Sequence, residues 1–512
     1  MANSRLLKSS LIVSAGTMVS RVLGLVRDVV MANLLGATHS ADAFYVAFKI
    51  PNFFRRLFAE GAFAQAFVPV LSEYKENGGL AAVQDLANRV LAILGASLFT
   101  LCVLAWFAAP GIAWVFASGF HQYPDKLALT ADLIRWTFPY LGFISLVAFA
   151  GGILNTYGRY AVPALTPVLL NLSLIGAALW LTPWAETPAH ALAFGVLIAG
   201  VSQLLFQVPF LWRLSLLPRP VWDTQHPGVR KILLLMAPAM LAVSVSQINL
   251  LLDTVLASWL EGGSVAWLYY SDRLTELPLG VIGIAIGTVV LPSLSALSAK
   301  DDRQAFRDGL AWAVRTVLLL GVPAAVALWV LATPILSTLF FHGAMTPYDV
   351  MQSTASLQAY TLGLTAFMLV KVLAPGFFSR QDMKTPVKIA TAALLANMVF
   401  NLILIWPLAH VGLALATSIS AWLNAGLLAW MLTRQGYFEP LALLRHRRTL
   451  AIGASALLMA LVLSWLAPAA EWWLMADLQQ RTVQLAALIG VGLLVYVAGL
   501  GLLGWRPSHL SR

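Results

Sequence analysis

The chain has 512 residues, of which 60% are hydrophobic and only 11% are charged. An ordinary soluble domain carries about 25% charged residues, so this composition excludes a soluble globular protein and indicates an all-α membrane protein with many spans. The formal net charge of +10 does not indicate a nucleic-acid-binding protein, because the Lys and Arg residues are scattered among short loops and apolar segments and form no solvated basic arm.

Hydrophobic segments follow one another along the whole chain. A membrane-spanning helix needs about 20 apolar residues, and fourteen segments meet this requirement. They cover roughly residues 8–35, 41–72, 84–117, 127–157, 161–182, 189–213, 230–260, 264–297, 309–341, 348–379, 387–408, 411–434, 449–467 and 482–505. The first is interrupted by Arg21 and Arg27 and lacks a clear small-residue cleavage site, so we interpret it as a retained helix and not as a signal peptide.

The basic residues of the loops alternate along the chain. They occur at the N-terminus and after every even-numbered segment, while the opposite loops hold almost none. Examples are Lys75, Arg159, Arg213, Lys300, Arg380 and Arg434. Short loops rich in Lys and Arg stay in the cytoplasm, so both termini are predicted to be cytoplasmic. The alternation also favours an even number of spans.

A weak internal repeat divides the chain. The stretch from Val68 to Ser72 ends the second segment, and a similar stretch from Leu291 to Ser295 ends the eighth. A shift of six spans keeps the orientation, so we predict two six-helix lobes related by a pseudo-two-fold axis along the membrane normal. These lobes comprise residues 1–220 and 221–440, and residues 441–512 add two C-terminal helices.

Charged residues inside the first segment need an explanation. Arg21, Arg27 and Asp28 lie within apolar sequence. A charge at the centre of a membrane helix costs roughly 2.5 to 3.5 kcal/mol on insertion scales, so such residues usually face a polar cavity and mark a transport or ligand path. Arg21 and Asp28 are seven residues apart and share a helical face.

The second segment carries the sharpest pattern of charges. Four polar residues spaced by 3, 4 and 4 positions form one helical stripe, and Arg55 lies beside it. They are Lys49, Asn52, Arg56 and Glu60. Pro51 removes a backbone hydrogen bond next to the stripe and predicts a kink there, which is typical of transporter helices that line a cavity.

The second predicted lobe also has charged residues inside its apolar segments, but fewer of them. Asp272, Arg273 and Glu276 form a group in the eighth segment, and Lys371 stands alone in the tenth. With the predicted orientations, the cations of both lobes form a ladder across the membrane. Guanidinium groups clamp phosphate oxygens bidentately and Lys adds a point charge, so the ladder is suited to an anionic headgroup.

Several alternatives remain open from the residues alone. The charges could instead pair with one another and hold helices together. Within transport, the chain could move another polyprenyl-diphosphate glycan or export drug cations, although drug cations favour an acidic cavity. A membrane enzyme or a binding scaffold are the other classes. The sequence contains no nucleophile motif, phosphate-binding glycine loop or nucleotide fingerprint, so we predict neither an enzyme nor a cofactor.

Eight stretches of the chain carry a family resemblance. They are Ser20–Gly24 with Arg27–Asp28, Ala41–Phe44, Pro51–Asn52 with Arg55–Arg56, Phe58–Phe63, Tyr270–Arg273, Leu291–Leu294, Lys371–Phe377 and Asp382–Pro386. In these the chain resembles the MurJ (MviN) family of lipid II flippases, within the multidrug, oligosaccharidyl-lipid and polysaccharide exporter superfamily. The resemblance implies fourteen helices, two lobes around a cationic central cavity, and a groove for the lipid tail in residues 441–512.

The resemblance also implies a function and a set of site residues. It implies a transporter that moves the undecaprenyl-diphosphate-linked peptidoglycan precursor from the inner to the outer leaflet of the bacterial inner membrane by alternating access. It marks Arg21, Arg27, Asn52, Arg55, Arg56, Arg273 and Lys371 for substrate binding, and Asp28, Asp42, Glu60, Asp272 and Glu276 as gating residues or charge partners. Lipid II and membrane lipids are the implied partners of a monomer. The energy source stays open between membrane potential and ions, with Asp253 and Asp382 as candidate sodium ligands.

Overall fold

The computed structural model describes residues 2–57 and 63–506, with only the backbone described at 2–15 and at some positions between 237 and 288. Throughout these residues the secondary structure is helical and no strand occurs. The predicted all-α membrane fold is therefore confirmed. Two compact units are present, Met1–Ala266 and Trp267–Arg512. The boundary between them lies inside a helix, whereas the boundary at residue 220 predicted from the repeat lies in a loop and stays a prediction.

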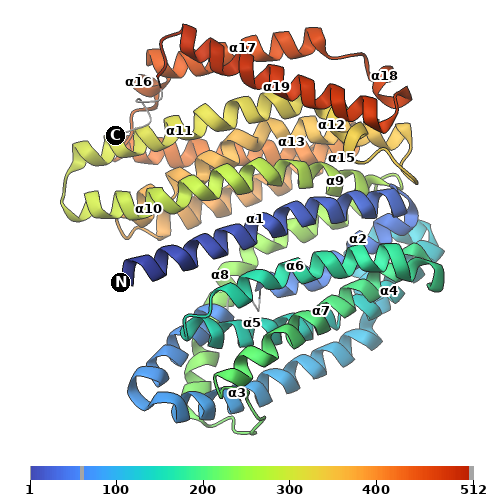
Figure 1. Cartoon of the computed structure of the whole chain (residues 1–512), viewed down its shortest axis with the longest axis vertical. Coiled ribbons are helices and arrows are strands. Elements are labelled where there is room, and N and C mark those ends of the chain that lie inside the picture. The colour runs from blue at the N-terminus through green and yellow to red at the C-terminus, as the bar shows by residue number, and fades with distance from the viewer. Residues whose placement is uncertain (1, 58–62, 507–512) are drawn as a thin grey trace. The chain divides into compact units, whose positions relative to one another are not determined.

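In both units, short connections join most successive helices (Figure 1). The first unit contains α1 (Ala2–Leu35), α2 (His39–Phe54), α3 (Ala64–Phe116), α4 (Pro124–Thr137), α5 (Tyr140–Thr156), α6 (Ala161–Gly176), α7 (Pro188–Arg213) and α8 (Pro227–Ser258). Helix α9 (Ser264–Pro278) begins in the first unit and continues into the second. The second unit contains α10 (Ile284–Ala299), α11 (Arg303–Val330), α12 (Ala332–Leu339), α13 (Pro347–Leu373), α14 (Pro375–Phe378), α15 (Lys384–Arg434), α16 (Pro440–Arg445), α17 (Arg447–Leu466), α18 (Ala470–Met475) and α19 (Leu478–Leu502).

Each predicted segment coincides with a helix or with a short run of helices. Within the described ranges, nine helical stretches are long and apolar enough to cross a bilayer. Two of them are double. Helix α3 is broken at Gly79, where φ is 64°, and α15 is broken at Ala409, where φ is 49°. These breaks fall at or near the loops that separate predicted spans, and the full number of fourteen spans stays a prediction.

The core of the first unit is built from the facing sides of α3, α5 and α8. Phe67 and Phe149 pack with their ring centroids 5.2 Å apart, and both rings are fully buried. Ile153 of α5 and Val229 of α8 complete the same cluster. Moving an aliphatic or Phe side chain from water into a protein core stabilises it by about 1.5–3 kcal/mol. Moving it from lipid into the core gains little hydrophobic free energy, so close packing holds these helices together.

The second unit has a core of its own and an added helical pair. Helices α10, α11, α13 and α15 share one apolar cluster that includes Leu310, Leu364 and Leu428. Helices α17 and α19 lie side by side and pack against α11 (Figure 1). The hydroxyl of Tyr496 in α19 donates a 2.7 Å hydrogen bond to the carbonyl oxygen of Leu319 in α11. This hydrogen bond helps to fix the position of α19 along α11.

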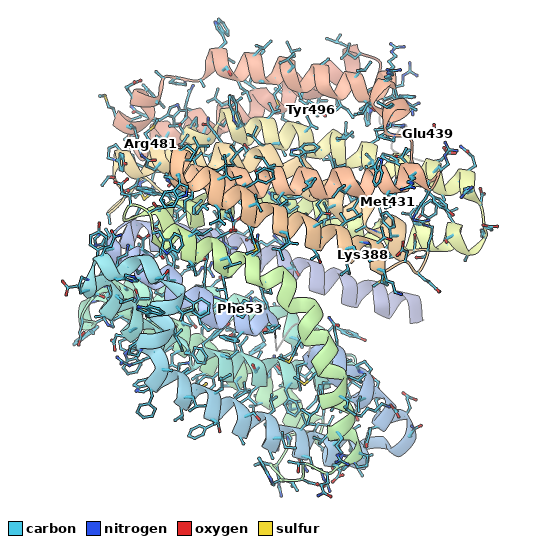
Figure 2. The ribbon with its side chains drawn as sticks, turned by 180° about the vertical axis from the view of Figure 1, so that it is seen from behind. Phe53, Lys388, Met431, Glu439, Arg481 and Tyr496 are labelled. Carbon is cyan, nitrogen blue, oxygen red and sulfur yellow. The ribbon has the colours of Figure 1, made fainter. Side chains whose placement is uncertain are left out.

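Arg481 anchors the other part of α19 (Figure 2). Its Nε donates to the carbonyl oxygen of Ala476 at 2.8 Å, and one terminal nitrogen donates to those of Ser337 and Phe341 at 3.0 and 3.2 Å. The guanidinium also lies 4.8 Å from the centroid of the Phe341 ring. A buried cation is tolerated here because carbonyl dipoles and an aromatic face replace its water shell.

Arg481→Met is expected to destabilise the second unit. The variant keeps the apolar length of the side chain but leaves three carbonyl oxygens without their charged donor. Each hydrogen bond to a charged group contributes about 1.5–3 kcal/mol, so we expect a loss of at least about 2 kcal/mol. The melting temperature of the purified protein in detergent measures the effect. Thr482→Val, which removes a hydroxyl on the exposed side of the same turn, is the control, and an equal melting temperature for both variants would contradict the assigned role.

Candidate functional site

Each unit contains a helix that is interrupted by a π-helical turn. In the first unit α2 ends at Phe54, and the chain continues as a π-helical turn over residues 55–57 before α3 begins. In the second, α9 ends at Pro278 and is followed by the π-helical turn Leu279–Gly283 and then α10. Such turns are rare and occur frequently at functional sites. The first unit has a further π-helical turn at Ala177–Leu181, and the repeat stays a prediction.

The first of these turns carries Arg55 and Arg56. Arg55 Nε donates to Asn52 Oδ1 at 3.2 Å, and Asn52 Nδ2 donates to the carbonyl oxygen of Phe48 at 2.8 Å. Pro51, whose ring cannot donate to the helix, lies directly before this pair. Arg55 is half-buried and Arg56 is exposed. Arg56 of the predicted stripe and Arg55 beside it therefore lie next to each other on a π-helical turn.

Lys49, one turn earlier, has a partner on another helix of the same unit. Its Nζ lies 3.0 Å from the hydroxyl of Thr254 in α8. Helix α2 is further fixed to α4 by a 3.1 Å hydrogen bond from the hydroxyl of Thr137 to the carbonyl oxygen of Ala47. Helix α2, which carries the polar stripe, is therefore held by contacts with both α8 and α4.

Arg27 and Asp28 form a buried pair in α1. The Arg27 guanidinium donates through two nitrogens to Asp28 Oδ1, at 3.0 and 2.6 Å, and through a third to Asn171 Oδ1 of α6 at 3.1 Å. Both side chains are buried. Arg21, two turns earlier, is half-buried and forms no side-chain hydrogen bond or ion pair within the described residues. The structure therefore gives the two arginines of α1 different surroundings.

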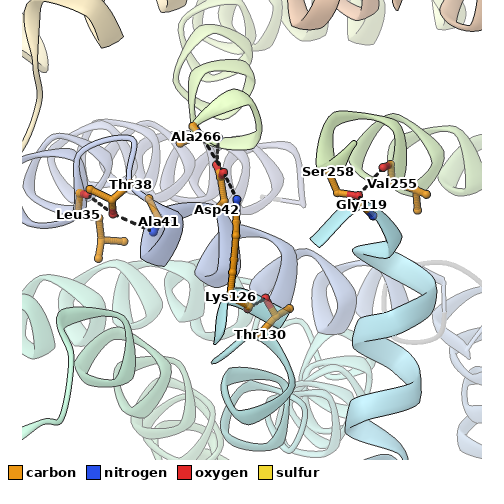
Figure 3. A network of polar contacts seen from close by, with 11 residues as sticks. Leu35, Thr38, Ala41, Asp42, Gly119, Lys126, Thr130, Val255, Ser258 and Ala266 are labelled. Atoms are coloured by element: carbon orange, nitrogen blue, oxygen red, sulfur yellow. Dashed lines mark hydrogen bonds and ion pairs between the residues drawn. The ribbon is translucent and has the colours of Figure 1, made fainter. Parts of the chain in front are cut away.

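Asp42 is a buried acid of the predicted set with several partners (Figure 3). Its carboxylate, only 1% exposed, lies 2.7 Å from Lys126 Nζ of α4. It also accepts hydrogen bonds from the backbone N–H groups of Gly263 and Ala266, at 2.7 and 3.0 Å. The Lys126 ammonium lies 3.9 Å from the centroid of the Phe120 ring. One carboxylate thus joins α2, α4 and the start of α9.

In the second unit, the predicted charged residues Asp272, Arg273 and Glu276 lie within about one turn of α9. Arg273 forms a 2.6 Å ion pair with Glu276 one turn later, and both side chains are partly exposed. Asp272, next to Arg273, is exposed. Lys371 is exposed near the end of α13, and its side chain passes close to Gly283 of the π-helical turn. Lys371 and that turn are therefore neighbours within the second unit.

Several partners of the predicted residues could not have been found from the sequence. Lys126, Asn171 and Thr254 are 84, 144 and 205 positions away from the charges they contact. Of these three, only Lys126 stands out in the sequence, because few cations lie near the loops that are predicted to be outside the cytoplasm. Glu60 lies outside the described residues.

The two candidate sodium ligands have separate surroundings. Asp253 lies in α8 of the first unit, whereas Asp382 precedes α15 in the second and accepts a 3.0 Å hydrogen bond from Thr385 N. Desolvation raises the pKa of the Asp382 carboxyl, but hydrogen bonds from Thr385 and the charge of Arg380 outweigh it and hold the pKa below its usual value. In the part of the chain that the structure describes, no three His, Cys, Asp or Glu side chains gather as a metal site.

An apolar cavity of about 310 Å³ lies among α3, α5 and α8 of the first unit. Its walls include Phe63, Leu94, Ile232 and Met236, and the buried hydroxyl of Ser145 is among its few polar groups. A diphosphate would lose its hydration there without compensation. The cavity therefore suits an apolar group and not the headgroup that the cations would bind.

Comparison with known proteins assigns the family. Residues 31–483 match the family model described as "Lipid II flippase MurJ". The chain belongs to the MurJ family. Curated members of this family resemble it over nearly the full length. It is 47% identical to a probable lipid II flippase MurJ of Vibrio cholerae, over 99% of this chain and 98% of that protein. It is 38% identical to the lipid II flippase MurJ of Burkholderia cenocepacia, with 99% of both chains covered.

Solved structures agree with the MurJ assignment. The chain matches a lipid II flippase MurJ in an inward closed conformation with a TM-score of 0.80 and 28% identity, over 96% of this chain and 98% of that one. An inward-facing multidrug transporter of the MATE family matches with a TM-score of 0.67 at 15% identity, over 83% of this chain and 98% of that one. This second likeness shows that the chain has the same fold as that transporter.

Proposed function

We propose that the chain is a lipid II flippase, a transporter and not an enzyme, which serves peptidoglycan synthesis in the bacterial inner membrane. The observation that carries this proposal is the match to the MurJ family along residues 31–483, together with relatives of that name over nearly the whole chain. The substrate would be the undecaprenyl-diphosphate-linked precursor, moved from the inner to the outer leaflet. Both termini would lie in the cytoplasm, and the protein would act as a monomer.

The cations supply the chemistry for the diphosphate. Arg55 and Arg56 project from a π-helical turn, and Arg21 carries no ion pair within the described residues. Arg273 and Lys371 are the corresponding cations of the second unit. Arginine binds phosphate oxygens through two parallel N–H groups, and this geometry distinguishes a phosphate from other anions. These five residues would contribute to a cationic cavity that opens to each side of the membrane in turn.

The buried and paired charges would have another role in this scheme. Arg27 with Asp28 and Asp42 with Lys126 are fully enclosed ion pairs, which are costly to separate. We propose that they hold helices in one state and exchange partners as the transporter changes state. Glu276, paired with Arg273, would release that arginine when substrate arrives. Asn52 would orient Arg55, whereas Asp272 and Glu60 would act as further charge partners.

The apolar part of the substrate would stay in lipid. Helices α17 and α19 expose many large apolar side chains, among them Leu457, Leu461, Leu493 and Leu494. Such a face can accompany a polyprenyl chain at no hydrophobic cost, because lipid tails and leucine are equally apolar. We propose that residues 441–512 guide the lipid tail while the headgroup crosses.

One reconstitution assay tests this function. Purified protein is placed in vesicles with fluorescently labelled lipid II, and the label exposed outside is measured by a membrane-impermeant quencher. A flippase makes the inner pool accessible without chemical change of the lipid, as chromatography of the recovered material checks. Vesicles that hold a labelled polyprenyl-diphosphate glycan without peptide test the breadth of substrate. Unchanged leaflet exposure in a membrane potential of either sign would refute the proposal.

A further inference from the structure

A group of cations lies at one end of the interface between α11 and α17. Farther along, this interface is apolar and includes Leu319 of α11 and Ile452 of α17. One turn before Leu319 stands Arg315, and one turn before Ile452 stands Thr449. His446 caps the N-terminus of α17, accepting a 3.2 Å hydrogen bond from the backbone N–H of Arg448 at its Nδ1. We call Arg315, His446, Arg448 and Thr449 the α11–α17 cluster.

Two polar atoms of the cluster are enclosed without a partner. Within the described residues, neither Arg315 Nε nor the Thr449 hydroxyl has a hydrogen-bond partner, although Thr449 is only 8% exposed. Arg481 provides the contrast, because its guanidinium donates to three carbonyl oxygens in the same unit. Buried polar groups in folded proteins are nearly always satisfied, and an exception calls for an explanation such as a bound ligand.

Within the described residues, no ion pair compensates the positive charges of the cluster. Partial burial and the positive charges of Arg315 and Arg448 lower the pKa of the His446 imidazole, and both neighbouring charges that act on it are cationic. The N-terminus of α17, a helix of 20 residues, adds a partial positive charge and N–H groups. Every one of these features favours an anion that accepts hydrogen bonds.

Exposed leucines lie next to the cluster, beside the exposed cations Arg445 and Arg447. Leu441 and Leu444 of the short helix α16 and Leu450 of α17 are all more than half exposed. Arg315 lies about 18 Å along α11 from Arg303, at a rise of 1.5 Å per residue, so it sits within the membrane-spanning helix and not in a loop. An anion with an apolar part suits this position, next to exposed leucines. This favours a lipid over a free ion.

We propose that the α11–α17 cluster binds the phosphate of an anionic membrane phospholipid. The phosphate accepts from the Arg315 and Arg448 guanidinium groups and from the Thr449 hydroxyl, while the acyl chains lie along the exposed leucines. This site goes beyond the transport of lipid II, because it is formed entirely by the second unit and lies apart from Arg273 and Lys371 in the chain. The bound lipid anchors α17 to α11.

Native mass spectrometry of the full-length protein in detergent tests the site. The protein is titrated with phosphatidylglycerol, and phosphatidylcholine serves as the lipid without net charge. We expect Arg315→Gln and Thr449→Val to weaken the tightest phosphatidylglycerol binding, by about tenfold for Arg315→Gln, since it loses the charge-assisted hydrogen bonds. The control is Arg434→Gln, which removes an exposed cation whose ring contact is with Trp430. A photoactivatable phosphatidylglycerol should label residues 440–452 in the wild type and lose that label in Arg315→Gln.

Each outcome decides the proposal. Equal phosphatidylglycerol affinity and equal labelling for wild type and Arg315→Gln would overturn it. Displacement of the lipid by millimolar inorganic phosphate would also overturn it, because the site would then hold a free anion. Melting temperatures without added lipid verify that the variants are folded, and Thr449→Val, which keeps the shape of the side chain, supplies the answer if Arg315→Gln does not fold. Lipid II flipping can fail or succeed independently of these results.

Discussion

Arg55→Ala is expected to abolish growth of a bacterial strain that has this chain as its only flippase, at unchanged protein levels. Arg55 lies on the π-helical turn after α2 and is oriented by Asn52 at 3.2 Å. Its removal takes away a charged donor for the diphosphate, and a hydrogen bond to a charged group is worth about 1.5–3 kcal/mol. Flipping by the purified protein should then fall by about 10- to 150-fold, since every 1.4 kcal/mol is tenfold. The quencher assay measures this rate.

The matched variants separate charge from geometry. Arg55→Lys keeps the charge but not the planar fork, so it should retain part of the rate. Arg273→Ala in the second unit should also abolish growth. Arg434→Ala, an exposed cation at the end of α15, should grow normally. If both Arg55→Ala and Arg273→Ala support normal growth, the assignment of these residues to the substrate path is wrong.

Asp42→Ala is expected to produce the largest loss of stability among single substitutions of the charged set. The carboxylate is fully buried and accepts from Lys126, Gly263 N and Ala266 N. Removing one partner of a buried ion pair costs about 3–5 kcal/mol, because the remaining charge is left unpaired in the interior. Two backbone N–H groups lose their acceptor as well. Thermal unfolding of the purified protein should show a strongly lowered midpoint or a failure to fold.

Lys126→Met tests the same contact from the other side. Here Asp42 keeps the two backbone donors, and the methionine retains packing against the Phe120 ring. The loss should therefore be smaller than for Asp42→Ala. The double variant Asp42→Ala with Lys126→Met should be less unstable than the sum of the two single variants, since neither charge is left alone. Additive losses would show that the two residues are not coupled.

The sequence predicted the helical architecture well because hydrophobicity and charge are local properties. Segments of about 20 apolar residues can cross a bilayer only as helices or as barrels, so the fold class follows from composition. The spacing of Lys49, Asn52 and Arg56 placed them on one stripe, and Pro51 predicted an interruption beside it. In the structure Pro51 lies inside α2, a separate π-helical turn follows at residues 55–57, and the kink at Pro51 stays a prediction.

Only the tertiary structure shows which residues contact the charged side chains. Arg21 and Arg27 lie six positions apart on α1 and have the same chemistry, yet Arg27 is buried against Asp28 and Asn171 while Arg21 is not. Which helix faces which depends on packing between segments that are far apart in the sequence, and no local pattern encodes it. The sequence by itself determined that this chain crosses the membrane many times and carries cations within its spans. Only the tertiary structure decided which of those cations are enclosed, because burial and pairing arise from the contacts of distant helices.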